Sequence, residues 1–161
     1  MREYVISDTH FDDSEIIRLQ SRPFSSVDEM NDFMLDSWNS IVRPSDTVYF
    51  LGDLAYRGRS TDHWYKRLNG SLIFIKGNHD SSRRILFEDN HLVVVDGLDL
   101  FMCHNPRRSP KTWPGWVVHG HSHTRKEFLD RRKRRANVCV EHIEYLPLDL
   151  EELVERIRCC S

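Results

Sequence analysis

Five short clusters of metal-binding and acid–base residues follow apolar runs in this 161-residue chain. They read SDTH, LGDL, GNHD, MCHN and HGHSH in chain order, and they contain seven donors: Asp8, His10, Asp53, Asn78, His104, His121 and His123. Carboxylate, amide and imidazole groups are good ligands for borderline divalent cations. Seven donors are too many for one tetrahedral ion, but they suit two ions if one carboxylate is shared. The clusters therefore predict a site for two divalent metal ions.

The charge of such a site favours a phosphate ester as substrate. Two divalent ions would be offset by Asp8, Asp53 and a bridging hydroxide, which leaves the cluster at about +1 and attractive to a phosphate group. Neutral Asn78 and the imidazoles add coordination without repelling the substrate. A hydroxide that bridges the two ions is expected to attack phosphorus in line with the leaving oxygen.

The stretch IKGNHD contains the candidate residue that protonates the leaving oxygen. Gly77 lets the chain turn, and Asn78 faces a metal. His79 is not needed as a ligand, so we expect it to act as the general acid that assists the leaving group. Asp80 is the second candidate catalytic residue, which orients or anchors this loop.

The elements around these clusters predict an α/β fold. Seven short apolar runs are strand candidates, at residues 3–7, 47–51, 71–76, 91–95, 98–103, 115–119 and 137–141. Helices are expected at 27–42, behind a capping box of Ser26 and Glu29, at 60–68, and from Asp149 onward. The pattern predicts helices over two packed sheets, with the clusters gathered where strand ends converge on a crevice.

Length and composition bound the possibilities. With 161 residues and 39% hydrophobic residues, the chain is expected to form a single domain over 1–161. A formal net charge of −2 excludes a global field that would attract nucleic acid or an anionic membrane. No apolar run approaches a bilayer span and no signal-peptide pattern opens the chain, so a cytoplasmic protein is expected. Cys103, Cys139, Cys159 and Cys160 form no C-x-x-C pair, which argues against a disulfide framework or a zinc ribbon.

The series D-x-H, G-D, G-N-H-[D/E], H and G-H-x-H resembles the calcineurin-like metallophosphoesterase superfamily, over residues 5–123. The resemblance implies a four-layer αββα sandwich of two packed mixed β-sheets flanked by helices. It also implies one metal held by Asp8, His10, Asp53 and His123, and a second held by Asp53, Asn78, His104 and His121, with Asp53 bridging. Manganese is the expected metal, with iron, zinc or nickel as alternatives.

The stretch from RPFSSVDEM to GDL resembles a small stand-alone phosphoesterase subgroup, with two departures. Where the subgroup has H-F-G-H-x-N-I, this chain has HFDDSEII, which places Asp12, Asp13 and Glu15 near the first metal and is expected to alter substrate preference. In GDLAYRG, Tyr56 stands where the protein Ser/Thr phosphatase branch has an Asp that pairs with the catalytic His. This argues against that branch and leaves the partner of His79 open.

The function predicted from these residues is metal-dependent hydrolysis of phosphodiesters or small phosphomonoesters, including nucleotide-derived esters. Candidate substrate contacts are Arg107, Arg108 and Arg22. A nuclease or an enzyme that processes RNA ends or cyclic phosphates is one alternative, and a catalytically silent metal-binding scaffold is another. The oligomeric state stays open.

Several residues have a structural interpretation that is favoured over a functional one. The basic run 131–135 is expected at a solvated hairpin tip, with contact to nucleic acid as the less favoured alternative. Trp113 and Trp116 are expected to pack rather than to stack on a base. His63, His91 and His142 are expected to be ordinary polar residues. For His119, which lies inside the strand before GHSH, packing and a functional role are both left open.

Overall fold

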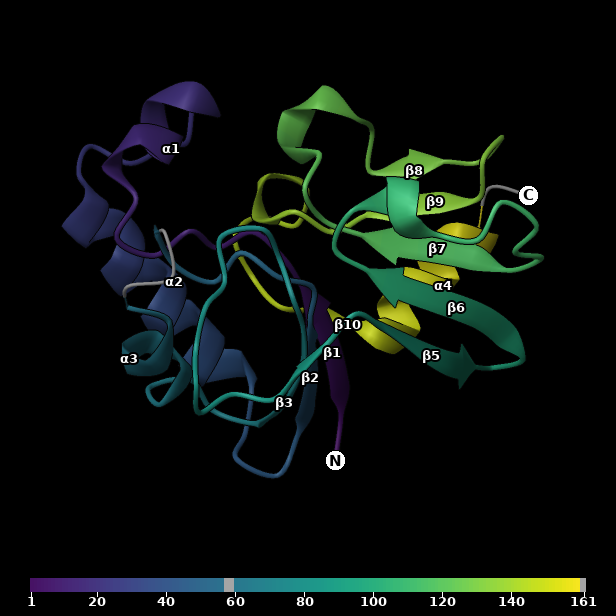
Figure 1. The fold of residues 1–161 in the computed structure, drawn as a ribbon, viewed down its shortest axis with the longest axis horizontal. Coiled ribbons are helices and arrows are strands. Elements are labelled where there is room, and N and C mark those ends of the chain that lie inside the picture. Colours follow the sequence, from purple (N-terminus) through teal and green to yellow (C-terminus); the bar gives the residue numbers. More distant parts are fainter. Residues whose placement is uncertain (57–59, 160–161) are drawn as a thin grey trace.

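The computed structural model describes residues 1–56 and 60–159, and two five-stranded mixed sheets form its centre (Figure 1). The first sheet has the order β10-β1-β2-β3-β4, with the bounds β1 (Glu3–Ile6), β2 (Thr47–Phe50), β3 (Ser71–Ile75), β4 (Phe87–Glu88) and β10 (Leu148–Asp149). All its neighbouring strands run parallel except β10. Ile6 pairs with Phe50, and Phe50 pairs with Phe74, so the strands end at one edge. The segments that follow β1, β2 and β3 therefore meet there.

The second sheet has the order β5-β6-β7-β9-β8. Its strands are β5 (Asn90–Val95), β6 (Leu98–Cys103), β7 (Trp116–His119), β8 (Leu129–Asp130) and β9 (Arg135–Asn137). The parallel strands β6, β7 and β9 are in register at their ends, because Cys103 pairs with His119 and His119 pairs with Asn137. His104 and the GHSH segment consequently start from the same edge of this sheet.

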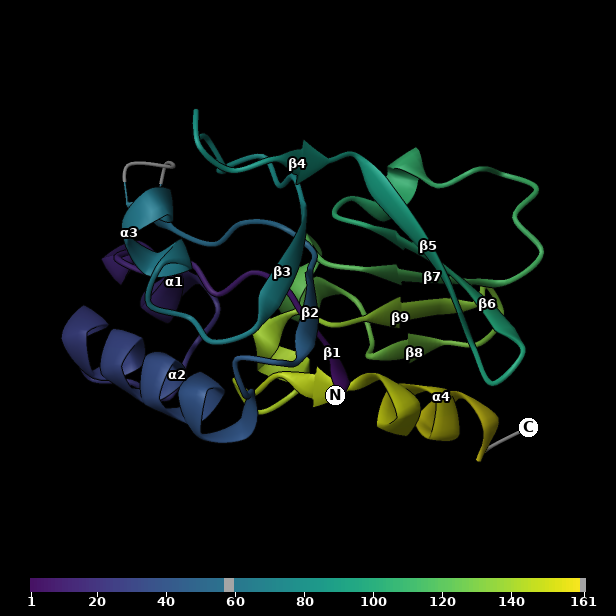
Figure 2. The same cartoon turned by 90° about the horizontal axis from the view of Figure 1, so that it is seen from below.

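Helices flank the two sheets, as Figures 1 and 2 show. The α-helices are α1 (Ser14–Leu19), α2 (Val27–Ile41), α3 (Thr61–Tyr65) and α4 (Leu150–Arg158), and the 3-10 helices include η2 (Pro106–Arg108), η3 (His123–Arg125) and η4 (Val140–His142). The first three α-helices lie beside the first sheet, and α4 contacts β1 and β10 of the first sheet and β5 of the second. The buried apolar face of α2 supplies Met30, Met34 and Trp38 to the core. The predicted α/β fold of two mixed sheets with flanking helices is confirmed.

The helix ends follow the capping signals in the sequence. The Ser26 hydroxyl accepts from the Glu29 N–H at 3.1 Å, and the Asp149 carboxylate accepts from two N–H groups in the first turn of α4. Helix α1 is not predicted by the sequence pattern, and it begins behind Asp13, which caps it in the same way. Its single buried apolar residue, Ile16, is too few to produce a helical periodicity.

The predicted strand at 137–141 is wrong beyond Asn137, where β9 ends. From there the chain crosses toward the first sheet: Cys139 forms an isolated bridge with Ser7, and the Val140 N–H donates to the Ser7 carbonyl at 3.1 Å. The carbonyl at the end of β1 is thereby paired, and η4 follows. The apolar run continues past Asn137 because the crossing segment is buried, not because it is a strand.

Other expectations concern the turns and the thiols. Residues 131–134 of the basic run form the turn between β8 and β9 and Arg135 begins β9, so the predicted hairpin is confirmed. Cys103 and Cys139 are buried free thiols and Cys159 is exposed, whereas Cys160 lies outside the described residues. None of the described helices has the length and apolar character needed to cross a membrane.

Candidate metal centre

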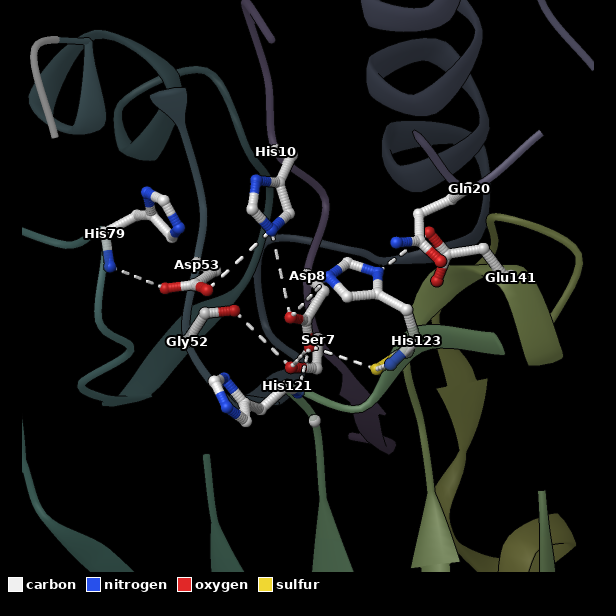
Figure 3. A network of polar contacts seen from close by, with 12 residues as sticks. Ser7, Asp8, His10, Gln20, Gly52, Asp53, His79, His121, His123 and Glu141 are labelled. Carbon is white, nitrogen blue, oxygen red and sulfur yellow. Dashed lines mark hydrogen bonds and ion pairs between the residues drawn. The ribbon is translucent and has the colours of Figure 1, made fainter. Parts of the chain in front are cut away.

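The predicted ligands converge where the ends of the two sheets meet (Figure 3). Two groups form, in each of which one ligand atom per residue lies within 4.8 Å of the others. The first group is Asp8, His10 and His123, and the second is Asp53, His104 and His121. Six of the seven predicted donors are thus gathered from the segments that follow β1, β2, β6 and β7.

Asp8 is the centre of the first group. Its Oδ1 lies 3.4 Å from His123 Nε2 and 3.9 Å from His10 Nε2. Its Oδ2 accepts from the His121 N–H at 2.9 Å and from the Ser7 hydroxyl. One carboxylate oxygen is therefore fixed by the protein, and the other faces two imidazoles.

Asp53 joins the two groups. Its Oδ2 lies 3.7 Å from His10 Nε2 in the first group and 3.3 Å from His104 Nε2 in the second. Its Oδ1 accepts from the His79 N–H at 2.8 Å. The seventh predicted donor, Asn78, has Oδ1 at 3.0 Å from His104 Nε2, so it belongs to the second group.

Three of the imidazoles turn the same nitrogen toward the centre. Nδ1 of His104 lies 2.7 Å from the Leu51 carbonyl oxygen, and Nδ1 of His123 lies 3.0 Å from Glu141 Oε1. Nδ1 of His10 faces Asp13 Oδ2 at 3.4 Å. In His104 and His123 an outer acceptor for Nδ1 fixes the ring and leaves Nε2 for a metal, as is usual for ligating histidines.

Buried polar atoms test whether these residues fit a metal ion. Asp8 Oδ1 and both ring nitrogens of His10 are buried and have no hydrogen-bond partner among the residues that the structure describes. Burying such groups unpaired costs free energy, and native structures rarely leave them so. Nitrogen and oxygen donors of this kind suit borderline divalent cations. The donor set therefore fits divalent metal, and the unpaired atoms point to where it would bind.

The backbone around the site adopts conformations that only glycine prefers. Five of the predicted ligands have positive φ: Asp8 at 61°, His10 at 53°, Asp53 at 60°, His121 at 65° and His123 at 43°. Each non-glycine residue held there costs on the order of 1–3 kcal/mol. Such strain persists only where the surroundings impose it, and it gathers at binding and catalytic sites.

Electrostatics lowers the pKa of the Asp8 and Asp53 carboxyls and raises the pKa of two of the imidazoles, those of His10 and His104. Burial raises the pKa of Asp8, but the neighbouring imidazoles of His10 and His104 outweigh it and hold that pKa well below its usual value. Burial lowers the pKa of His10, yet Asp13 and Asp8 outweigh it and raise that pKa to about 9. The pKa of His104 also rises to about 9, because Asp53 and Asp8 oppose the effect of burial. Metal binding at these imidazoles must therefore displace protons.

The predicted catalytic residues lie in different environments. His79 is half-buried, and its ring meets the edge of His10 with centroids 5.2 Å apart. Asp80 is buried, and its carboxylate accepts from the N–H groups of Asp53, Leu54 and Gly77 at 2.7, 3.0 and 2.9 Å. These bonds tie the loop after β3 to the loop after β2, which corresponds to the anchoring role expected for Asp80.

The three arginines that are candidate substrate contacts lie in different parts of the structure. The guanidinium of Arg22 is fully buried and pairs with Glu141 at 2.7 Å, which gives it a structural position beneath the site. Arg107 is exposed and lines the same cavity as His121. Arg108 is also exposed on η2, but it is not among the residues that line that cavity.

The remaining histidines and tryptophans have ordinary surroundings. His91 lies 2.8 Å from Glu88, and His142 Nε2 lies 2.9 Å from the His123 carbonyl oxygen. His119 is buried, and burial lowers its pKa to about 4. Trp113 packs on Phe101 with ring centroids 5.6 Å apart.

A family model described as calcineurin-like phosphoesterase matches residues 1–155 of the chain. The chain belongs to this family. It is 38% identical over 162 residues to the uncharacterized protein MJ1445 of Methanocaldococcus jannaschii, with 96% of this chain and 90% of that protein covered. The crystal structure of the protein of unknown function AQ665 from Aquifex aeolicus matches it with a TM-score of 0.71 and 23% identity, over 97% of this chain and 99% of that one. The structure of a novel archaeal phosphodiesterase matches with a TM-score of 0.49 and 20% identity, over 86% and 82%.

Within this calcineurin-like chain, the sequence pattern missed the support beneath the ligands. Glu141 lies 3.0 Å from His123 Nδ1, and together with Cys139 these residues form a third donor group. The signal was present, because Glu141 is an acid that directly follows an apolar run, as the ligand clusters do. In the DD pair after His10, Asp13 faces His10, whereas Asp12 accepts from the Trp64 indole at 2.8 Å.

Proposed function

We propose that this chain is a dinuclear-metal phosphoesterase that hydrolyses phosphodiesters or small phosphomonoesters. The observation that carries the proposal is the position of Asp53 Oδ2, which lies 3.7 Å from His10 Nε2 and 3.3 Å from His104 Nε2 and so faces both donor groups. One oxygen between two groups is suited to bridging two ions. Membership of the calcineurin-like phosphoesterase family supports the same reaction class.

The proposed ligand set divides at Asp53. Asp8, His10 and His123 would hold one ion with Asp53, and Asn78, His104 and His121 would hold the other. A pair of divalent ions supplies Lewis acidity toward the phosphoryl group and lowers the pKa of water enough to give a nucleophile near neutral pH. Manganese remains the predicted metal, and a cytoplasmic location remains a prediction.

His79 is proposed as the residue that gives a proton to the leaving oxygen. Its N–H is held by Asp53 Oδ1 and its ring lies against His10, so the side chain stands at the rim of both donor groups. Asp80 does not contact the substrate in this proposal. It holds the backbone from which Asn78 and His79 project.

The test is hydrolysis of bis(p-nitrophenyl) phosphate and p-nitrophenyl phosphate by protein loaded in turn with manganese, iron, zinc or nickel. Asp53→Asn and His79→Ala are expected to lower kcat by at least about 100-fold, since general acid catalysis alone contributes that much. His63→Ala is the matched control, because His63 is exposed on α3 outside both donor groups. Rates in the two variants equal to that of the control would refute the mechanism.

A catalytically silent metal-binding scaffold is the competing function. The complete donor set and the retained His79 argue against it, because a scaffold needs neither a proton donor nor a shared carboxylate. A metal-loaded protein that hydrolyses no mono-, di- or cyclic phosphate ester would favour the scaffold.

A further inference from the structure

A basic groove leaves the metal centre along the outer face of the second sheet. Its near half is a cavity of about 430 Å³ that starts at His121 and is lined by five cationic side chains and two carboxylates. The cations are Arg107, Arg125, Lys126, Lys133 and Arg135, and the carboxylates are Glu127 and Asp130. Asp130 is already paired with Lys133 at 3.2 Å. The near half is therefore strongly positive, although the whole chain has a formal net charge of −2.

The far half of the groove is a second cavity, of about 580 Å³, that shares Arg107, Lys133 and Arg135 with the first. It adds Lys111, Arg132 and Arg134, and none of its lining residues is acidic. The shared side chains place the two cavities next to each other, with Arg135 at their boundary. The segment between β6 and β7 supplies one side of both cavities and the β8–β9 hairpin supplies the other. The Arg135 guanidinium links the two sides by donating to the Pro106 carbonyl at 3.2 Å.

The floor of the groove is the sheet face that points away from the core. Val117 pairs with Arg135, so both side chains project from this face, whereas Val118 and Ala136 point into the core. At the far end lies Trp113, a half-buried ring in the wall of the second cavity. A basic path with an aromatic ring is the arrangement that proteins use to hold single-stranded nucleic acid.

Several cationic side chains of the groove are not used to hold the fold together. Among the residues that the structure describes, the side chains of Arg107, Lys111, Arg125, Lys126 and Arg132 make no hydrogen bond or ion pair. By contrast Arg131, the first residue of the basic run, donates to carbonyls at the end of α4 at 2.8 and 3.1 Å and points away from the groove. The run is thus divided between one structural arginine and a set of cations along the groove.

We propose that the groove binds the phosphate backbone of a single-stranded nucleic acid and leads it to the metal centre. The proposal rests on the proposed function, since it names the substrate class of the same site. A small ester would reach only the metal centre, whereas an oligonucleotide would also occupy the far half. Each backbone phosphate held by a cation releases counterions, so binding must depend on salt.

The test separates the groove from the metal centre with two double variants of equal charge change. Lys111→Glu with Arg132→Glu alters the far half of the groove. Arg43→Glu with Lys66→Glu is the control, because both side chains are exposed near the first sheet, away from the groove. Binding of a fluorescein-labelled single-stranded 12-mer is measured by anisotropy from 50 to 300 mM NaCl, in the Asp53→Asn background to prevent cleavage, and folding is checked by circular dichroism.

The groove variant is expected to bind the 12-mer about tenfold more weakly at low salt. Its plot of log K against log[salt] should be shallower by about 1.4, or about 0.7 for each backbone phosphate that the protein no longer neutralises. The control should match the parent protein. With Asp53 restored, both double variants should hydrolyse bis(p-nitrophenyl) phosphate at the wild-type rate. Unchanged oligonucleotide binding in the groove variant, or equally weakened binding in the control, would overturn the proposal.

Two further outcomes distinguish a failure of the groove proposal from a failure of the proposed function. Normal hydrolysis of the small ester without salt-dependent oligonucleotide binding would refute the groove as a nucleic-acid site and leave the proposed function intact. Absence of hydrolysis together with the expected binding pattern would refute the proposed function and keep the groove as a nucleic-acid site. Inorganic polyphosphate that displaces the 12-mer at an equal phosphate concentration would overturn the assignment to nucleic acid.

Discussion

The buried position of Arg22 predicts that this side chain stabilises the fold and does not bind substrate. Its Nη2 donates to Glu141 Oε1 at 2.7 Å and to the Asp8 carbonyl at 2.8 Å, and its Nη1 donates to the Thr9 carbonyl at 2.8 Å. The guanidinium is 0% exposed and the Glu141 side chain 3%. Arg22→Met would leave the Glu141 carboxylate buried beside one remaining partner, His123.

The expected cost follows from the burial of that carboxylate. Removing one partner of a buried ion pair destabilises a protein by about 3–5 kcal/mol, out of a total of about 5–15 kcal/mol for a typical domain. The two carbonyls that lose their donor add to the cost. With a urea m-value of about 2 kcal/mol/M, the midpoint of unfolding should fall by about 2 M.

The assay is urea unfolding of metal-free protein at pH 7, followed by tryptophan fluorescence. Glu141→Gln and the double variant complete a thermodynamic cycle, in which the double variant should cost less than the sum of the single ones, because it leaves no unpaired charge. Arg18→Met is the control, since Arg18 is exposed on α1. A change within about 0.5 kcal/mol for Arg22→Met, as expected of surface substitutions, combined with a raised KM, would show that Arg22 contacts substrate and that the reasoning is wrong.

Three further predictions concern the metal, the packing and the pH dependence. Manganese or zinc added to chelator-treated protein should raise Tm in a thermal scan. At a free metal concentration of 100 times Kd, the free energy of unfolding should rise by about 2.7 kcal/mol. In Asp8→Asn most of this metal-induced increase in Tm should be absent. A Cβ on Gly120 would overlap the Asp8 carboxylate, so Gly120→Ala should cost about 1–3 kcal/mol in urea unfolding and weaken metal binding. The backbone N–H groups of Arg2 and Arg43 lower the pKa of Asp46. Its stabilising effect should be fully present above its unfolded pKa of about 3.9 and be lost as pH falls through the lower folded-state pKa. Wild type and Asp46→Asn should therefore converge at the acid end of a urea-unfolding series across pH.

Each of these has a contrary result. An equal metal-induced shift in Asp8→Asn would mean that the ion binds elsewhere. Wild-type metal affinity in Gly120→Ala would mean that the Asp8 loop can move aside at no cost. A stability difference between wild type and Asp46→Asn that persists at the acid end of the pH series would mean that the side-chain shape, and not the carboxylate charge, holds the turn before β2.

The positions of the candidate ligands at strand ends could be predicted from the sequence because strand ends are a local property. Apolar runs with the right period end before Asp8, Asp53, Asn78, His104 and His121, and parallel strands in register bring such ends to one edge. The same reasoning located the caps of α2 and α4, since the capping residue and its N–H partner are only two or three positions apart.

The support beneath the ligands was decided by the tertiary structure. Arg22 and Glu141 are 119 positions apart, and they meet because the chain leaves β9 at Asn137 and crosses to the end of β1. The sequence shows that Arg22 carries a charge. Only the folded structure excludes water from its guanidinium and brings that group to Glu141. The same holds for the basic run, in which Arg131 turns to α4 while its neighbours line the groove.

The sequence by itself thus determined which residues stand at the ends of strands, because period and chain order are encoded locally. Only the tertiary structure decided which nitrogen of each imidazole faces inward, which arginine is buried and where the exposed cations line up. Those features depend on sheet register and on desolvation between segments that are distant in the chain, and neither has a local signal.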